Sequence, residues 1–427
     1  MNKTEFSKKL LSNDFDEQLL KVYVTKEEIE VQKKRYNELY ELFCDEFNCD
    51  EGVTFVSAPG RTEVCGNHTD HNHGKVLAAG INLDAVAAAR KVDGNIIRVK
   101  SVGYPMDVID ILDLNVHEEL FAKSSEIIRG MCAGFVEWGY KAGGFEAYTT
   151  SNVLSGSGLS SSAAFEVLIG SVLNSLYNDN KVPAEEIAKI AQYAENKYFG
   201  KPCGLMDQMA SAVGSFIEID FKDTKNPIIS KVDFDFSKCG YALCIVDTGG
   251  SHANLTGEYA AVRENMKAVA HLFGKEVLRD VDEDEFYKSI KMIREKVGDV
   301  PVIRAMHFFE DNKRVDREAE ALKANDFKTF MENVIESGRS SYMYNQNVFP
   351  VSSPKNQNLS VALAVAEKIL KGKGAWRVHG GGFAGTMQAF VPMDTLSEYL
   401  CMMKSIYGEN SCYVLTIRPV GGVEVLK

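Results

Sequence analysis

The sequence lacks an apolar run of the roughly 18 residues that a membrane-spanning helix needs, so it predicts no membrane segment. Its beginning, MNKTEFSKKLLSNDFDEQLL, contains no apolar stretch typical of a secretory signal peptide. Basic residues are the minority, 48 against 60 acidic ones, which gives a net charge of -12. Because nucleic acids and anionic lipid surfaces bind basic protein surface, neither is expected as a partner. With no predicted signal peptide or membrane segment, the expected location is the cytoplasm.

Cysteine pairs of the CxxC type are also missing. The nine cysteines form an odd set that is scattered from Cys44 to Cys412, mostly beside apolar residues. This pattern predicts free, buried thiols in a reducing compartment.

The length of 427 residues exceeds what one hydrophobic core usually serves, so two domains are expected, although no repeat or linker marks a boundary. Strand-like and helical patterns interleave without a regular βαβ period, which indicates an α+β fold. Pro59-Gly60 is expected to break the first strand. The periodicity predicts helices over 15–48, 163–176, 183–198, 258–273, 316–337 and 359–370, and strands over 53–58, 76–92, 95–102, 145–150, 242–247, 386–391 and 412–419.

A cluster of histidines stands out in GNHTDHNHG, residues 66–74. Histidine and carboxylate side chains are common metal ligands, so this stretch taken alone suggests a metal site. Its order is His-x-Asp-His-x-His, whereas metal-hydrolase clusters of this type run His-x-His-x-Asp-His. For His71 and His73, surface or packing roles are the simpler interpretation.

The most informative stretch is SNVLSGSGLSSSAAFEVLIG, residues 151–170. Gly156 and Gly158 permit a tight backbone path, three serines supply hydroxyls, and an apolar helix follows with free N–H groups at its start. Together these features predict a site for phosphate groups. The stretch is neither a Walker A loop, which needs Gly-Lys-Ser/Thr, nor a dinucleotide-binding loop, which needs a third glycine.

GSGLSSSAA resembles the phosphate-binding motif of the small-molecule kinases that include galactokinase, homoserine kinase, mevalonate kinase and phosphomevalonate kinase, the GHMP family. Four further segments are similar to its galactokinase branch and occur in the family's order. They are APGRTEVCGNHTDHNHG (58–74), GKPCGLMDQMAS (200–211), TGEYAAVR (256–263) and HGGGFAGTMQAFVP (379–392). The resemblance begins near residue 53, and the first 50 residues carry no motif.

This resemblance implies a two-domain α+β fold with the active site in the cleft between the domains. Residues 1–218 would hold the sugar loop, the phosphate loop and the catalytic aspartate, and residues 219–427 the glycine motif HGGGFAG. The implied activity is transfer of phosphate from ATP to the anomeric hydroxyl of galactose, which gives galactose 1-phosphate. The implied partners are the sugar and ATP with Mg²⁺, and the expected assembly is a monomer or a weak homo-oligomer.

The resemblance also assigns individual roles. Asp207 matches the catalytic base and Arg61 the arginine that pairs with it. Ser162 and Glu195 match the magnesium ligands, and residues 66–74 become a sugar-binding loop. The implied phosphate contacts are Gly156, Ser157, Gly158, Leu159, Ser160, Ser161 and Ser162, and the implied sugar contacts are Asn67, His68, Asp70, Gly204 and Tyr259.

The chain departs from the family signature Gly-Arg-x-Asn-x-x-Gly-Glu-His-x-Asp-Tyr at three positions. Glu63 stands in place of Asn, Asn67 in place of Glu, and His71 in place of Tyr. Elsewhere, Leu154 replaces a proline and Ala384 a glycine. These changes leave the sugar open, with galacturonate or another C6-modified sugar as the alternative to galactose.

A second alternative is a non-catalytic sensor of sugar and ATP. Sensors related to this family lack a Ser-Ala pair in the phosphate loop. Ser162-Ala163 is present in this chain and favours an enzyme.

Overall fold

Two long strands, β1 (Thr54–Cys65) and β2 (Lys75–Lys91), organise the fold, because each contributes to both of the units into which the chain divides. The structure is a computed structural model that describes residues 3–153, 158–250, 255–383 and 385–427. Unit 1 comprises Met1–Arg61, Gly80–Ser215 and Ile417–Lys427, and unit 2 comprises Thr62–Ala79 and Phe216–Thr416. The division expected at residue 218 separates the chain once, whereas these units interleave along it.

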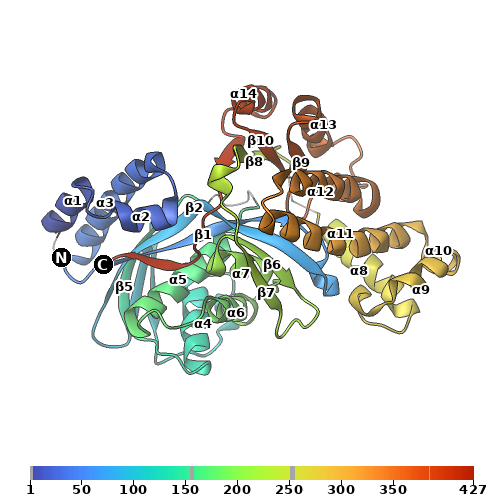
Figure 1. Ribbon diagram of the computed structural model, residues 1–427. Helices are drawn as coiled ribbons and strands as arrows, with labels where there is room; N and C mark the ends of the chain where they lie inside the picture. Colours follow the sequence, from blue (N-terminus) through green and yellow to red (C-terminus); the bar gives the residue numbers. More distant parts are fainter. Residues whose placement is uncertain (1–2, 154–157, 251–254, 384) are drawn as a thin grey trace. The chain divides into compact units, whose positions relative to one another are not determined.

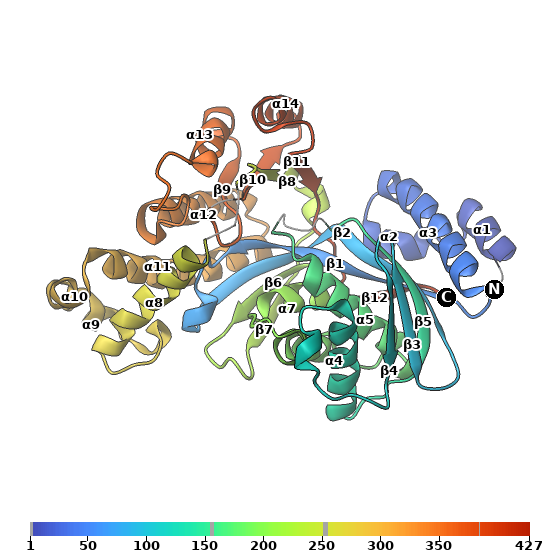
Figure 2. The same ribbon diagram turned by 180° about the vertical axis from the view of Figure 1, so that it is seen from behind.

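Unit 1 contains a sheet with the strand order β12-β1-β2-β5-β3-β4, of which Figure 1 labels β1, β2 and β5 and Figure 2 labels all six strands. The pairs for which a register is defined are antiparallel, except for the parallel pair β3–β5. The remaining strands of this sheet are β3 (Ile96–Ser101), β4 (Met106–Asp110), β5 (Phe145–Ser151) and β12 (Val423–Leu426). Its helices are α1 (Lys3–Leu11), α2 (Asp16–Tyr23), α3 (Lys26–Phe47), α4 (Ser124–Glu137), α5 (Ser161–Tyr177), α6 (Ala184–Ala194) and α7 (Met206–Val213).

The helices of unit 1 cover the two faces of this sheet. Val86 and Ala88 of β2 belong to the core cluster that buries α1, α2 and α3. Since successive side chains of a strand point to opposite faces, the intervening Ala87 faces the other side. There α4, α5 and α6 pack together, as Figures 1 and 2 show from two directions. The unit is therefore three layers deep, with the N-terminal helices as an outer layer.

Unit 2 contains a four-stranded antiparallel sheet with the order β11-β8-β10-β9. Alternate residues of β8 and β10 enter a core cluster with two helices, α13 and α14. In addition, the start of β2 pairs with β6, and β6 pairs with β7. The strands are β6 (Phe216–Asp220), β7 (Ile228–Val232), β8 (Tyr241–Asp247), β9 (Ala375–Val378), β10 (Thr386–Pro392) and β11 (Cys412–Leu415).

A second core cluster in unit 2 joins α8, α10 and α11. Phe330 of α12 packs edge-on against Phe390 of β10, with 5.1 Å between the ring centroids, so α12 lies against the four-stranded sheet. The helices are α8 (Thr256–Leu272), α9 (Glu283–Lys288), α10 (Ile290–Val297), α11 (Asp299–Lys323), α12 (Phe327–Ser340), α13 (Asn358–Leu370) and α14 (Leu396–Tyr407).

The expected break at Pro59-Gly60 was wrong, because β1 continues through both residues. Proline fits an extended backbone where its missing N–H is not needed, and the Pro59 carbonyl accepts a hydrogen bond from the Ser211 hydroxyl at 2.6 Å. A Cβ on Gly60 would lie 2.8 Å from the Leu159 carbonyl oxygen. Gly60 therefore gives the loop before α5 room to approach the strand.

The single helix expected over 316–337 was also wrong, because the chain turns between α11 and α12. Asn325 adopts the left-handed conformation with a φ of 55°. Asp326 then caps α12, and its side chain accepts a hydrogen bond from the Thr329 backbone N–H. Asn and Asp favour such positions, so the turn residues override the helical pattern.

Among the described residues, no helix is long and apolar enough to cross a membrane. All nine cysteines are free. Cys65, Cys132 and Cys244 are buried as expected, whereas Cys401 is exposed.

Asp84 of β2, whose side chain is fully buried, is the centre of a polar network in unit 1. Its carboxylate forms ion pairs with Arg35 of α3 and with Arg418 near the C-terminus, and it accepts a hydrogen bond from Tyr23 at 2.7 Å. Ser57 of β1 also donates to it. Burial alone would raise the pKa of Asp84, but the two guanidinium groups outweigh it and hold this pKa below its usual value. The network thus ties the N-terminal helices to β1, β2 and the last residues.

We expect Asp84→Asn to lower the free energy of unfolding by about 3 kcal/mol, because it leaves the buried Arg418 and the mostly buried Arg35 without their counter-charge. Asp179→Asn is the matched control, since Asp179 has an 83% exposed side chain in an ion pair with Lys181. Denaturant unfolding at several pH values measures both variants.

The stability that Asp84 contributes should decrease at acidic pH. A depressed carboxyl pKa stabilises the folded state above the unfolded pKa, and this stability disappears as pH falls through the folded value. The difference in the free energy of unfolding between wild type and Asp84→Asn should therefore be constant at neutral pH and become smaller only below about pH 4. Equal free energies of unfolding for the two proteins at pH 7 would contradict the role given to Asp84.

Candidate active site

The centre of the candidate site is an ion pair between Arg61 at the end of the unit 1 part of β1 and Asp207 in the first turn of α7. The guanidinium donates from Nε to Oδ1 at 2.7 Å and from Nη2 to Oδ2 at 2.8 Å. This two-point geometry fixes both side chains. The Arg61 side chain is 10% exposed and that of Asp207 is 33% exposed, so the carboxylate keeps access to a reactant.

The charge state of Asp207 follows from these neighbours. Burial by itself raises the pKa of a carboxyl group, but the Arg61 charge and the hydrogen bonds from Arg61 and Ser160 hold the pKa of Asp207 below its usual value. Asp207 is therefore ionised at neutral pH and can accept a proton.

The same arginine holds the loop before α5. Its Nη1 donates to the Gly158 carbonyl, and its backbone N–H donates to the Leu159 carbonyl at 3.1 Å. Ser160 has a φ of 57°, which is uncommon for a residue other than glycine, and its hydroxyl donates to Asp207. Backbone strain of this kind is typical of functional loops.

The first N–H groups of α5 have no partner within the helix, as at the start of any α-helix. Its N-cap is Ser160, whose side chain makes no capping hydrogen bond, and the first helical residues are Ser161 and Ser162. Ser162 is exposed and Leu159 is buried. Of the other expected phosphate contacts, Gly156 and Ser157 lie outside the described residues, and so do Leu154 and Ala384.

Glu195 lies where α6 passes into a π-helical turn, Glu195–Phe199. Its side chain is 3% exposed and forms an ion pair with Lys201 at 3.0 Å. The Gln208 amide donates to Glu195 at 2.8 Å and to Glu166 at 3.0 Å, so it links the two carboxylates. Burial and the Glu195 charge raise the pKa of Glu166 to about 8, and Glu166 Oε1 is buried without a hydrogen-bond partner.

Within unit 2, three of the expected sugar-binding residues share one partner, the glycine segment Gly380–Gly382. Asn67 Nδ2 donates to the Gly380 carbonyl at 2.5 Å. His68 Nε2 lies 2.8 Å from the Gly381 carbonyl, and the Tyr259 hydroxyl donates to the Gly382 carbonyl at 2.9 Å. Asp70 begins a short 3-10 turn after His68, and Gly204 is exposed in unit 1.

Two of the three clustered histidines, His68 and His71, are hydrogen-bonded to each other in unit 2. His68 must donate from Nε2 to a carbonyl, so its Nδ1 is the acceptor for His71 Nε2, which lies 3.4 Å away. Burial and then the neighbouring His68 hold the pKa of His71 well below its usual value. Over the described part of the chain, no group of three or more His, Cys, Asp and Glu side chains is placed to hold a metal.

Two buried residues of α11 that no motif indicated hold the backbone of the expected sugar loop. The Asp311 carboxylate accepts hydrogen bonds from the N–H groups of Gly66 at 3.2 Å and Asn67 at 3.1 Å. His307 Nε2 lies 2.8 Å from the Asn67 carbonyl. The only sequence signal is their spacing of four residues, which places two polar side chains on one face of a helix.

Comparisons with known proteins agree on one family. Residues 126–215 match the description "GHMP kinases N terminal domain", and residues 41–91 match "Galactokinase galactose-binding signature". A galactokinase of Glaesserella parasuis is 31% identical over 83% of this chain and 88% of its own length. A galactokinase of Streptomyces coelicolor is 31% identical over 79% of this chain and 83% of its own.

Solved structures give the same result. A crystal structure of Lactococcus lactis galactokinase complexed with galactose has a TM-score of 0.76 and 25% identity, over 91% of this chain and 99% of that one. The mevalonate kinase of Methanococcus jannaschii, at 14% identity and a TM-score of 0.60, shares the fold over 86% of this chain and 99% of its own. The expected GHMP kinase fold, a mixture of helices and strands, is thus confirmed. With these sequence and structural matches over most of its length, the chain belongs to the galactokinase family of GHMP kinases.

Proposed function

We propose that the protein transfers the γ-phosphoryl group of ATP to the anomeric hydroxyl of galactose and releases galactose 1-phosphate and ADP. The observation that carries the proposal is the ion pair of Arg61 with an accessible, ionised Asp207, in a chain of the galactokinase family. The expected setting is the cytoplasm, with the protein as a monomer or a weak homo-oligomer.

In the proposed reaction, Asp207 attracts the proton of the anomeric hydroxyl as its oxygen attacks the γ-phosphorus. The new O–P bond forms while the bond to the β-phosphate oxygen breaks, and ADP leaves with the electron pair of that bond. The proton passes to the Asp207 carboxylate. Arg61 keeps Asp207 ionised before the reaction and stays cationic throughout, so it also stabilises negative charge that gathers on the transferred group.

The phosphates of ATP fit the start of α5. Free backbone N–H groups and the positive end of the helix dipole favour anions there. The proposed contacts among the described residues are Gly158, Leu159, Ser160, Ser161 and Ser162.

A magnesium ion, when bound with ATP, neutralises phosphate charge, and we propose Ser162 and Glu195 as its protein ligands. The donor set fits a hard cation because it offers a hydroxyl and a buried carboxylate. The Gln208 amide links Glu195 to Glu166, whose Oε1 atom is buried without a hydrogen-bond partner. A cation bound at Glu195 would offset the repulsion between its carboxylate and that of Glu166.

For the sugar, we propose contacts from His68, Asp70, Gly204 and Tyr259. The histidine and the tyrosine hydroxyl are already oriented by the glycine segment. A carboxylate such as Asp70 can accept hydrogen bonds from two neighbouring hydroxyls of one sugar ring.

The direct test is a phosphorylation assay with galactose, galacturonate and other hexoses, in which phosphorus NMR identifies the product. We expect a sugar 1-phosphate from galactose in the presence of ATP and Mg²⁺. Phosphorylation at another position, or of another sugar in preference to galactose, would refute the proposal.

We expect Asp207→Asn to lower kcat by a factor of about 10² to 10⁴, because the amide cannot accept the proton, while galactose still binds. Steady-state kinetics and calorimetric titration with galactose measure the two effects. Near-normal turnover in the purified variant would exclude Asp207 as the base.

Arg61→Gln should lower kcat and also move the acidic limb of the pH–rate profile to higher pH. The reason is that loss of the guanidinium raises the pKa of Asp207, so the carboxylate becomes protonated at a higher pH. Arg90→Gln is the control, because Arg90 forms a comparable pair with Glu146 at 2.7 Å in the same unit. A change confined to the KM for ATP would instead make Arg61 a nucleotide contact.

Glu195→Gln should raise the magnesium concentration needed for half-maximal activity more than it raises the KM for galactose, because it removes a charged oxygen ligand. Glu185→Gln, in the first turn of the same helix α6, is the control. The measurement is a magnesium titration at saturating ATP and sugar. A curve that superimposes on that of the wild type would rule out the ligand role.

A further inference from the structure

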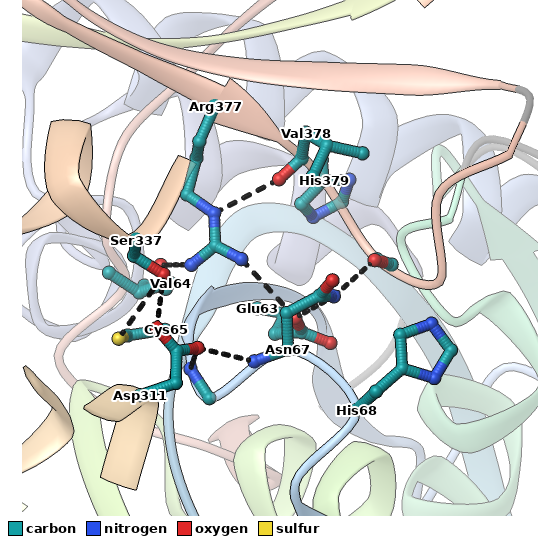
Figure 3. Close-up of polar contacts among 12 residues, drawn as sticks. Glu63, Val64, Cys65, Asn67, His68, Asp311, Ser337, Arg377, Val378 and His379 are labelled. Carbon is teal, nitrogen blue, oxygen red and sulfur yellow. Dashed lines mark hydrogen bonds and ion pairs between the residues drawn. The ribbon is translucent and has the colours of Figure 1, made fainter. Parts of the chain in front are cut away.

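The side chain of Asn67 is fully buried, and both atoms of its amide are bonded within the protein. Nδ2 donates to Glu63 Oε1 at 2.7 Å and to the Gly380 carbonyl at 2.5 Å. Oδ1 accepts from Asn347 Nδ2 at 2.5 Å. Figure 3 shows this amide directed toward Glu63, while the His68 side chain lies apart from it. The amide therefore has both of its N–H donors in use and no exposed surface to offer a ligand.

Glu63 gives that amide its orientation. A carboxylate only accepts hydrogen bonds, so the atom of Asn67 that faces it must be the NH₂ group. The charge of Glu63 is compensated inside unit 2 by Arg377, which is fully buried and lies 3.9 Å away. Arg377 is held in turn by the carbonyls of Val64 and Val378 (Figure 3).

Asn347 extends the network to the same glycine segment. Its Nδ2 donates to the Gly381 carbonyl at 3.1 Å as well as to Asn67. A Cβ on Gly382 would overlap the Asn347 carbonyl oxygen, so a side chain at this position would force the segment away. Consecutive carbonyls of Gly380, Gly381 and Gly382 thus accept hydrogen bonds from Asn67, His68 and Tyr259.

We propose that the Glu63–Asn67 pair is a positioning device for the sugar-binding side chains and that Asn67 does not contact the sugar. Through the Asn67 amide, the pair holds Gly380–Gly382 in register with the sugar loop, and this segment orients His68 and Tyr259. Asp311 and His307 bind the backbone N–H and carbonyl groups of Asn67. Of the polar groups of Asn67, its side-chain amide is therefore the one that contacts the glycine segment. The part that concerns the sugar rests on the proposed function.

The test changes the charges of the Glu63–Asn67 pair while it keeps the shapes of the side chains. A single variant adds a second carboxylate, and a double variant moves the charge from position 63 to position 67. Asn67→Asp sets a carboxylate against Glu63 and against the Gly380 carbonyl, so the KM for galactose should rise by about tenfold or more while the KM for ATP changes less than about twofold. In the double variant Glu63→Gln/Asn67→Asp, the amide introduced at position 63 can donate to the new carboxylate. We expect it to recover at least about threefold of the lost affinity, a coupling that independent sites would not show.

The matched control is Asn333→Asp, which makes the same substitution at another buried amide of unit 2, one that donates to the Thr329 carbonyl at 2.8 Å. Thermal unfolding of all variants separates loss of stability from loss of positioning. If Asn67→Asp raises the KM values for galactose and ATP alike, or leaves that for galactose unchanged, the proposal is wrong.

A comparison of two substrates tests whether Asn67 contacts the sugar. A positioning residue should change the specificity constants for galactose and galacturonate by the same factor. A ratio that changes in Asn67→Asp would show direct contact and overturn the proposal.

A readout without substrate keeps this inference separate from the proposed function. Hydrogen exchange of the backbone amides over 379–383 should be faster in Asn67→Asp than in the wild type or Asn333→Asp. If the wild type failed to phosphorylate galactose, the proposed function would fall while this measurement still tested the positioning. Unchanged exchange would refute the positioning even in an active galactokinase.

Discussion

The ion pair of Arg61 and Asp207 is the interaction on which the geometry of the candidate site in unit 1 depends. Every polar atom of the arginine side chain is committed within the unit, two nitrogens to Asp207 and the third to the Gly158 carbonyl. One side chain therefore fixes the start of α7 and the loop before α5 against the same strand. The loop in turn requires Gly60, because a Cβ there would meet the Leu159 carbonyl. The charge of the pair, the shape of the loop and the glycine in the strand are parts of one arrangement.

The strand β1 is held in place by a second buried charge. Asp84 binds Ser57 of β1 while it compensates the guanidinium groups of Arg35 and Arg418. The match to the galactokinase signature begins at residue 41, earlier than the expected start near residue 53. Through Arg35 and Tyr23, the residues before this match become part of the support for the strand that presents Arg61. Buried ion pairs contribute little net stability but tolerate few geometries, so their value here is in fixing positions.

The sequence could predict most of the regular elements, because they depend on local patterns, and it could predict the family, because several short motifs carry the resemblance. The helices over 163–176 and 359–370 and the strands over 145–150 and 242–247 agree with the structure to within a few residues. The errors arose where turn residues or long-range packing decide. Asn325 and Asp326 end a helix that periodicity would continue, and Pro59-Gly60 stays in a strand because the Ser211 hydroxyl and the loop before α5 make use of it.

The supporting residues of the sugar loop show why the rest of the site was beyond sequence reasoning. Asp311, His307, Asn347 and Arg377 lie some 240 to 310 residues beyond the loop they hold, and no short motif contains them. The departure at Asn67 looked, from its position in the signature, like a change in the part of the site that reads the sugar. Its environment indicates a different role, because the Asn67 amide is fully buried, donates to Glu63 and accepts from Asn347. Relative to the family signature, the amide and the carboxylate have exchanged positions, and the carboxylate, now Glu63, lies beside Arg377. These two positions thus still carry one amide and one carboxylate, as in the family signature, and what differs is that the charge stands at position 63 and not at position 67.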